Sequence, residues 1–251
     1  MLIEPLFEKL SSLRLAGIKE ALKEQLDQGP SDLSFEERVA LLVDREWLLR
    51  ENKRLSRRLQ SAKLKQTACI ENIDFKQSRG LEKAHIMELA QGRWIKDHRN
   101  VLITGPTGTG KTFLACALAH QGCLKGFSSR YYRLPRLLQD LRIARADGSY
   151  NKTLAMIAKM DLLILDDWGL SAFNNESRRD FLEMLDDRYQ LRSTIITSQL
   201  PIAHWHEYID ESTLADAILD RLVHQSVKIQ LKGESLRKND KGLCKEEETK
   251  K

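Results

Sequence analysis

The chain has 251 residues, 41% of them hydrophobic and 31% charged, and its 41 Lys and Arg against 36 Asp and Glu give a formal net charge of +5. This length accommodates one sizeable α/β core with a smaller appendage, and no apolar run approaches the roughly 18 residues of a membrane span. Residues 1–5 show no basic flank of a signal peptide, and no two of the four cysteines are spaced as in a zinc finger. We therefore expect a protein of the reducing cytoplasm with no membrane partner.

Residues 1–28 are expected to form a single amphipathic helix. Three leucines, Leu6, Leu10 and Leu13, recur at intervals of four and three residues and would share one face of that helix. Gly29, followed by a proline, would end it.

A second helix is expected to begin after Ser34. Glu37 follows three residues later, so the two side chains can cap each other's backbone N–H groups as a capping box. The helix then becomes strongly basic as far as Lys65. Because this part of the chain contains no strand pattern, residues 1–65 are predicted to form a small all-helical domain that binds DNA or a partner.

Residues 66–80 are predicted to connect this domain to the next. Ile73 and Phe75 are apolar residues within this polar stretch, and they would pack either on an adenine ring or on the core, with a slight preference for the core. A helix is expected over residues 81–91, with Gly92 ending it.

From residue 100 onward, short apolar segments alternate with helical patterns. The expected strands are 101–104, 129–132, 162–165, 194–197 and 227–231, and the expected helices are 135–146, 152–159, 176–190 and 214–224. This alternation predicts a five-stranded parallel sheet flanked by helices, with right-handed crossovers. We therefore assign residues 81–238 to an α/β domain and residues 239–251 to a charged tail.

The first expected strand leads into a glycine-rich loop and then a helix, a context that fits the pattern G-x-x-x-x-G-K-[ST] of an ATP-binding P-loop. Glycines let successive N–H groups turn inward, and the start of the helix adds a partial positive charge that favours phosphate. Lys111 would reach the β- and γ-phosphates, and the Thr112 hydroxyl would bind Mg²⁺. The alternative is a glycine-rich turn before an ordinary helix. The predicted nucleotide-binding residues are Gly105, Pro106, Thr107, Gly108, Thr109, Gly110, Lys111, Thr112 and Phe113.

Two acidic residues follow the fully apolar segment 162–165, about 50 residues after the P-loop. A buried parallel strand would place them at the carboxyl edge of the sheet, beside the phosphates. Asp166 would hold Mg²⁺, directly or through water, and Asp167 would orient or deprotonate the attacking water. After the next strand, Gln199 or Ser198 would sense the nucleotide, unless this is ordinary polarity at the end of a strand.

The positive charge of the chain is concentrated in two segments. Residues 45–65 hold eight basic and two acidic residues, and residues 125–152 hold seven and two, so the rest of the chain is net acidic. Two basic islands in an acidic protein indicate a nucleic-acid partner, although solvated helix faces would look the same. Phosphate contacts position a protein without reading sequence, so we expect weak sequence preference and steep salt dependence. The candidate DNA-binding residues are Lys53, Arg54, Arg57, Arg58, Arg133, Arg136, Arg142 and Arg145.

Four motifs in this order resemble the IstB family of helper ATPases, which are encoded beside the transposase in one class of bacterial insertion sequences. They are the P-loop at 105–112, LLILDDWG at 162–169, IITSQLP at 195–201 and AILDRL at 217–222. The resemblance covers essentially the whole chain, and the helicase loader DnaC is a more distant relative. The P-loop alone is specific only to a superfamily, whereas the ordered set of four is much more specific.

The resemblance implies an AAA+ ATPase that binds ATP and Mg²⁺ at subunit interfaces, assembles as a ring or filament on duplex DNA, and recruits its transposase. Arg221 would be the arginine finger that reaches the ATP of a neighbouring subunit, because a guanidinium is always charged and binds phosphate bidentately. The alternative for Arg221 is a surface ion pair with Asp216 or Asp220. Arg237 resembles a second nucleotide-sensing arginine. Many AAA+ proteins carry Asp-Glu where this chain has two aspartates, so its shorter second acid favours slow hydrolysis.

Three other functions are compatible with parts of the sequence. A helicase loader of the DnaC type would have the same chemistry and another client. A non-enzymatic, ATP-gated DNA scaffold would bind nucleotide without releasing phosphate. A P-loop small-molecule kinase would need a substrate pocket and lid arginines rather than a basic helical domain.

Overall fold

The structure is a computed structural model that describes residues 3–29, 32–75 and 79–236. The chain divides into two compact units, Met1–Arg57 and Arg58–Lys251, which we call the helical unit and the α/β unit. No helix within the described residues is long and apolar enough to span a bilayer.

The helical unit contains three helices, and the single helix expected over residues 1–28 is wrong. The chain forms α1 (Ile3–Ser12) and α2 (Ala16–Gln28) instead, separated by Arg14 at φ 59°. The N–H groups of Arg14 and Leu15 donate to carbonyls of the last turn of α1, which is a common left-handed helix ending. Glycine usually takes this position, so an arginine there gave no signal in the sequence.

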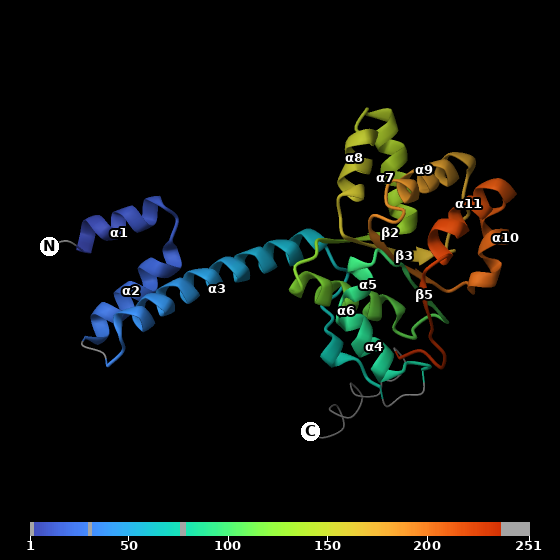
Figure 1. Cartoon of the computed structure of the whole chain (residues 1–251). Helices are drawn as coiled ribbons and strands as arrows, with labels where there is room; N and C mark the ends of the chain where they lie inside the picture. The colour runs from blue at the N-terminus through green and yellow to red at the C-terminus, as the bar shows by residue number, and fades with distance from the viewer. Residues whose placement is uncertain (1–2, 30–31, 76–78, 237–251) are drawn as a thin grey trace, which may run out of the picture. The chain divides into compact units, whose positions relative to one another are not determined.

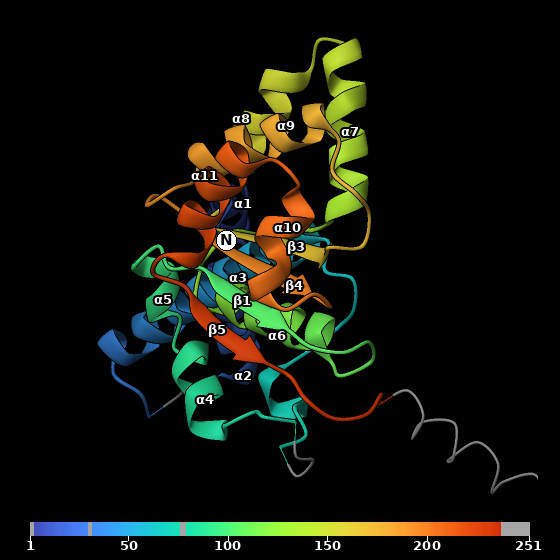
Figure 2. The same ribbon diagram turned by 90° about the vertical axis from the view of Figure 1, so that its right-hand side faces the viewer.

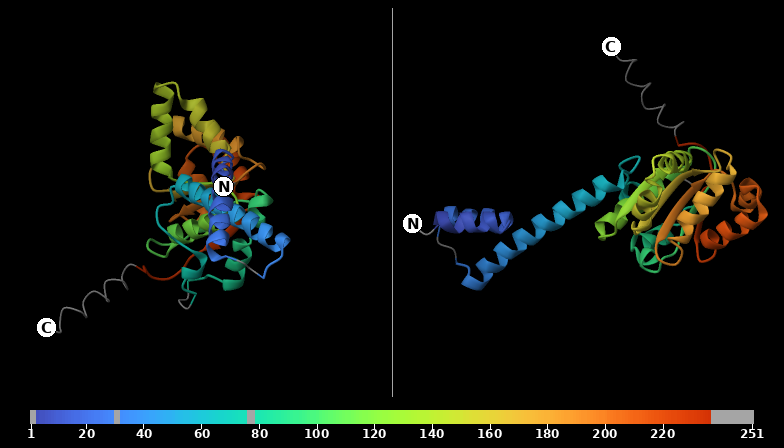
Figure 3. Two further views of the ribbon diagram at one scale, coloured as in Figure 1. Left: turned by 90° about the vertical axis from the view of Figure 1, so that its left-hand side faces the viewer. Right: turned by 90° about the horizontal axis from the view of Figure 1, so that it is seen from above.

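The third helix, α3 (Phe35–Ala62), begins where the capping box predicted it. The Ser34 N–H donates to Glu37 Oε2 at 2.8 Å, and the Glu37 N–H donates to Ser34 Oγ at 3.2 Å. Both halves of the box are therefore formed. Figure 3 shows α3 along its length.

A buried glutamate joins α2 to α3. Glu46 is 6% exposed, and its carboxylate accepts hydrogen bonds from the N–H groups of Gly17 (2.6 Å) and Ile18 (3.3 Å) in the first turn of α2. A negative charge is favoured at the start of a helix, where N–H groups lack intrahelical partners. Gly17 allows this contact, because a Cβ built there would lie 2.7 Å from Glu46 Cα.

The α/β unit is built on a five-stranded parallel sheet, as expected, with the strand order β2-β3-β4-β1-β5. Figure 1 labels β2, β3 and β5 of this sheet. The strands are β1 (Val101–Thr104), β2 (Ser129–Arg133), β3 (Leu162–Trp168), β4 (Ser193–Ser198) and β5 (Val227–Gln230). Each of the five expected strands is present. β3 runs three residues further than expected, and this extension carries both aspartates of the candidate site.

Helices cover both faces of this sheet (Figure 2). On one face, α4, α5 and α6 pack against Val101 and Ile103, and on the other face α7 to α11 pack against Leu102. Successive side chains of a strand point to opposite faces, so a strand covered on both sides is apolar throughout. The helices are α4 (Lys83–Ala90), α5 (Arg93–Lys96), α6 (Lys111–Leu124), α7 (Leu134–Ala146), α8 (Tyr150–Ala158), α9 (Asn175–Asp186), α10 (Trp205–Ile209) and α11 (Ser212–Val223).

The connector packs on the core, as the sequence favoured. Ile73 is buried among residues of α4 and α6, and Phe75 is partly buried against the same cluster. The connector also contains a short 3₁₀ helix, η1 (Ile70–Asn72), and a second one, η2 (Ile202–His204), precedes α10. The sequence did not predict α5 or α10, because helices of four and five residues are too short to show a period.

Candidate nucleotide-binding site

The glycine-rich loop between β1 and α6 is curled as a phosphate-binding loop. Gly105, Gly108 and Gly110 have φ values of 149°, 83° and 94°, which other residues adopt at a cost. α6 begins directly after Gly110, so its unpaired N–H groups lie at the loop. The Lys111 ammonium folds back over the loop and donates to the carbonyls of Gly105 (2.8 Å) and Pro106 (2.7 Å).

The segment after β5 lies directly against this loop. The N–H of Leu231 donates to Thr104 O at 2.7 Å, and the N–H of Leu236 donates to Gly108 O at 3.0 Å. A Cβ on Gly105 would lie 2.4 Å from Leu231 O, so this close approach requires glycine. The loop therefore depends on a segment more than 100 residues further along the chain.

Asp166 lies at the centre of the site and is 1% exposed. The Thr112 hydroxyl is 3.0 Å from both of its carboxylate oxygens, as expected if these two residues are to share a metal ion. Tyr131 Oη donates to Oδ2 at 2.6 Å, and Thr197 Oγ1 also contacts the carboxylate. Burial, followed by the hydrogen bond to Asp166, raises the pKa of Tyr131, so the phenol keeps its proton and donates. A carboxylate and a hydroxyl are hard oxygen donors, the kind that Mg²⁺ prefers beside phosphate oxygens.

Asp167 lines the same cleft as the P-loop and is paired with an arginine. Its backbone has a φ of 68°, and its carboxylate accepts a hydrogen bond from Arg133 Nε at 2.7 Å. The same hydrogen bond raises the pKa of Arg133. The sequence predicted a catalytic role for Asp167 and a DNA contact for Arg133, and the structure pairs the two side chains.

The two polar residues at the carboxyl end of β4, Ser198 and Gln199, both line the cleft, and Gln199 contacts the P-loop. Its Oε1 accepts a hydrogen bond from Thr107 Oγ1 of the P-loop at 2.7 Å. Ser198 is buried and donates to Trp168 O at 3.0 Å. Gln199 therefore has the position from which a nucleotide could be sensed.

The cleft over the P-loop has a volume of about 350 Å³. Phe113 lines it, as do Lys65 and Gln66, which the sequence analysis did not select. Tyr131 and Thr197 were missed as well. These residues come from separate segments of the chain, and only Thr197 lies within one of the four motifs. Thr197, which directly precedes the polar pair at 198–199, gave the nearest signal in the sequence.

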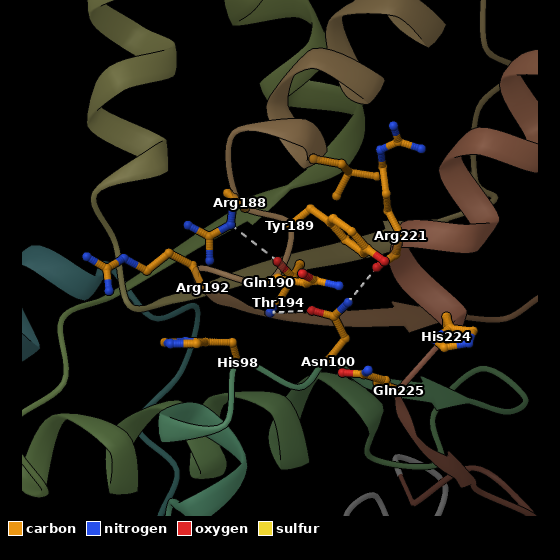
Figure 4. Close-up of a pocket in the computed structure, with 11 residues that line it drawn as sticks. His98, Asn100, Arg188, Tyr189, Gln190, Arg192, Thr194, Arg221, His224 and Gln225 are labelled. Atoms are coloured by element: carbon orange, nitrogen blue, oxygen red, sulfur yellow. Dashed lines mark hydrogen bonds between the residues drawn. The ribbon is translucent and has the colours of Figure 1, made fainter.

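Arg221 lies at the opposite edge of the sheet. It lines a small pocket with residues that precede β1 and β5 or begin β4, such as Asn100 and Thr194 (Figure 4). Its guanidinium pairs with Asp186 and lies 5.9 Å from the ring of Tyr189, so the alternative pairing with Asp216 or Asp220 is wrong about the partner. Parallel strands place their amino ends together, so Arg221 lies away from the P-loop of its own chain.

The candidate DNA-binding residues have different surroundings. Arg145 packs against Tyr150 and pairs with the buried Asp180, an arrangement that joins α7 to α9. Arg54 pairs with Glu51 at 2.6 Å, and the Arg58 guanidinium lies 3.5 Å from Cys123 O. Within the described ranges no acidic side chain pairs with the remaining four, Lys53, Arg57, Arg136 and Arg142. Arg237 lies outside the described residues.

The fold and the site together define a P-loop nucleotide-binding protein of the AAA+ class. The fold resembles the crystal structures of DnaI, with a TM-score of 0.58 and 23% identity over 66% of this chain and 91% of that chain, and of the DnaC helicase loader, with a TM-score of 0.57 and 20% identity over 66% and 97%. It also resembles the replication initiator DnaA bound to AMPPCP and single-stranded DNA, with a TM-score of 0.55 and 20% identity over 73% and 56%. At these identities the likeness shows the fold alone.

The sequence pattern of the family of IstB-like ATP-binding proteins matches residues 8–244, and the chain belongs to this family. An insertion sequence ATP-binding protein of Sinorhizobium fredii is 48% identical over 242 residues, which cover 96% of this chain and 99% of that protein. The ATP-binding protein of insertion sequence IS1162 from Pseudomonas fluorescens is 51% identical over 203 residues, which cover 80% and 88%. The chain is therefore an ATP-binding protein of the insertion-sequence type.

Proposed function

We propose that this protein is an ATPase that binds duplex DNA and assists transposition. The observation that carries the proposal is the meeting of Thr112, Asp166 and Lys111 at a P-loop in a chain whose relatives are insertion sequence proteins. Binding of ATP would drive assembly on DNA, where the protein selects the target and recruits the transposase. Hydrolysis would then remodel the assembly.

The proposal assigns roles in nucleotide binding and hydrolysis to the polar residues around the P-loop. Lys111 and the loop N–H groups bind the phosphates, and Thr112 with Asp166 holds Mg²⁺, which neutralises phosphate charge when bound. Asp167 orients the attacking water once Arg133 releases it, and Gln199 senses the terminal phosphate. The pairing of Asp167 with Arg133 supports slow turnover in the absence of DNA.

Arg221 acts in a neighbouring subunit. Its place at the opposite edge of the sheet from its own P-loop supports this assignment, because a neighbour in a ring or filament could bring a second P-loop to that edge. Its ion pair with Asp186 would be exchanged for phosphate on assembly. A guanidinium suits the task because it stays charged and binds phosphate oxygens in pairs.

Contact with DNA is assigned first to the four basic residues without an acidic partner among the described residues: Lys53, Arg57, Arg136 and Arg142. Arg58 remains a candidate. Contacts to phosphate give weak sequence preference, and binding should fall steeply between low and high salt. Binding that hardly changes over this range would contradict the proposal.

The decisive experiment is ATP hydrolysis with and without duplex DNA, with assembly followed by light scattering. Wild type is compared with Lys111→Ala, which should lose ATP binding, and with Arg221→Ala, which should keep ATP binding but lose turnover. DNA should stimulate the wild-type protein. Hydrolysis by a monomer that responds neither to DNA nor to Arg221→Ala would contradict the proposal and favour a small-molecule kinase.

The main alternative is a helicase loader of the DnaC type, since the fold of the α/β unit resembles that of the DnaC helicase loader. Parallel pull-downs against a transposase and a replicative helicase distinguish the two clients. Phosphate release that is undetectable even with DNA present would favour an ATP-gated scaffold instead.

A further inference from the structure

A lysine outside every predicted motif reaches the buried carboxylate of the site. Lys65 Nζ lies 3.5 Å from Asp166 Oδ2, and both residues line the cleft over the P-loop. The Asp166 side chain is 1% exposed, whereas that of Lys65 is 44% exposed. The carboxylate is therefore fixed, and the ammonium has room to move.

The partners of Asp166 differ in charge. Thr112, Thr197 and Tyr131 offer hydroxyl groups, which are neutral, while Lys65 brings a positive charge. A buried carboxylate is costly unless it is both hydrogen-bonded and paired with a positive charge. An ammonium on a flexible four-carbon stem can supply that charge and withdraw again.

The backbone around Lys65 is anchored while its side chain is not. Leu64 is partly buried against the core and Ala68 is fully buried. Gln66, the residue after Lys65, also lines the cleft over the P-loop. The ammonium is thus tethered within reach of the metal-binding residues.

We propose that Lys65 is a built-in counter-ion of Asp166 that Mg²⁺ must displace, and that it sets the Mg²⁺ concentration at which nucleotide binds. The inference rests on the proposed metal site at Thr112 and Asp166. Two cations cannot share one carboxylate oxygen at close range without repulsion, so binding of Mg²⁺ releases the ammonium. Lys65 therefore stabilises the metal-free protein and opposes entry of the metal.

The first readout is the Mg²⁺ dependence of ADP binding, which involves no hydrolysis, no DNA and no γ-phosphate. Fluorescent ADP is titrated over a range of Mg²⁺ concentrations with the full-length chain. Lys65→Met should lower the half-saturating Mg²⁺ concentration about threefold to fivefold, the scale of a half-exposed ion pair. The matched control is Lys63→Met, which removes an exposed lysine two residues earlier and should leave the midpoint in place. An unchanged or higher midpoint for Lys65→Met would overturn the proposal.

The second readout is thermal unfolding in EDTA without nucleotide, arranged as a double-mutant cycle. Lys65→Met should lower the midpoint by about 2–4 °C in the wild-type background and have no effect in the Asp166→Asn background. An equal loss in both backgrounds would show that Lys65 acts elsewhere and would overturn the pairing. If Asp166→Asn fails to fold, Lys65→Arg replaces the cycle, since an arginine keeps the charge and should keep the wild-type midpoint.

These readouts are independent of the transposition proposal. If DNA stimulates turnover but Lys65→Met changes neither midpoint, then the counter-ion inference alone fails. If both midpoints move as expected but DNA has no effect on turnover, then the proposed function fails and the inference stands.

Discussion

Each of the two units of this protein is stabilised internally in a different way. In the α/β unit the strand residues Leu102, Ile164 and Ile196 are fully buried between two layers of helices. In the described part of the helical unit, the buried hydrophobic residues are Leu10 and Ala21. Large apolar side chains remain at least one-third exposed there: Ile3, Leu6, Leu13, Leu26, Leu33, Phe35, Val39, Leu41, Val43, Trp47 and Leu48. The α/β unit therefore has its own hydrophobic core, whereas the helical unit presents an apolar surface typical of a contact region.

A buried carboxylate in each unit, Glu46 in the helical unit and Asp166 in the α/β unit, shows how the neighbouring groups decide what such a carboxylate can do. Glu46 contacts two backbone N–H groups and Arg50 at 2.7 Å, which joins two helices. Asp166 contacts three hydroxyls and an ammonium at the edge of a cleft. Backbone donors cannot leave, whereas hydroxyl and ammonium groups can turn toward a ligand. The contacts of Glu46 are therefore structural, whereas Asp166 can exchange its contacts for a ligand.

The largest effect should come from Asp166→Asn, which tests whether ATP hydrolysis depends on the α/β unit alone. Loss of the metal-binding charge should lower DNA-stimulated turnover about 100-fold or more, because stabilisation of phosphate charge depends on the metal. Hydrogen exchange of α1 and α2 should not change. The matched control, Asp187→Asn at an exposed position, should keep full turnover. Normal turnover in Asp166→Asn would show that the site is misassigned.

Gly17→Ala should damage the helical unit and spare the basal ATPase. The added Cβ would lie 2.7 Å from Glu46 Cα and 2.9 Å from Arg45 O, so α2 and α3 must separate. We expect a local loss of about 1–3 kcal/mol, measured as faster hydrogen exchange in α1 and α2. Gly29→Ala, where nothing lies within 4 Å of the new Cβ, should cost only the strain of a side chain at a φ of 78°. Turnover without DNA should be unchanged, and a large fall in it would show that the units depend on each other.

Arg133→Gln should produce a smaller effect and distinguish the arginine that pairs with Asp167 from the basic residues assigned to DNA contact. Release of Asp167 should raise turnover without DNA about threefold to fivefold, a modest factor because the arginine is half-exposed. The further stimulation by DNA should shrink. Arg136→Gln, which removes an exposed arginine three residues later, should leave basal turnover unchanged. Lower basal turnover in Arg133→Gln would mean that the arginine assists hydrolysis.

The smallest effect is the pH dependence that Glu46 gives to the helical unit. Burial raises the pKa of Glu46, but hydrogen bonds from Arg50, Gly17 and Ile18 outweigh it, so the net pKa falls below the ordinary value of 4.5. A lowered folded-state pKa contributes stability above pH 4.5, and that contribution is lost as the pH falls through the lower folded value. Hydrogen exchange of α2, corrected for intrinsic rates, should therefore differ between wild type and Glu46→Gln at pH 7 and converge as the pH falls below 4.5. A constant difference would contradict this account.

Much of the fold was predictable because its signals are local. The five strands follow from short apolar segments, and the start of α3 follows from Ser34 and Glu37 three residues apart. The curl of the P-loop follows from its glycines. The break at Arg14 was not predictable, because the leucine spacing runs up to Leu13 and an arginine rarely marks a left-handed helix ending.

The sequence by itself determined the kind of site, since the P-loop residues and Asp166 are chemically specific and closely spaced in motifs. Only the tertiary structure decided which side chains meet there. It paired Asp167 with Arg133, Gln199 with Thr107, Arg221 with Asp186 and Lys65 with Asp166. These pairs join segments far apart in the chain, and their contacts depend on strand order and on the packing of helices against the sheet. The local periodicity of the sequence specifies neither the strand order nor the packing of the helices.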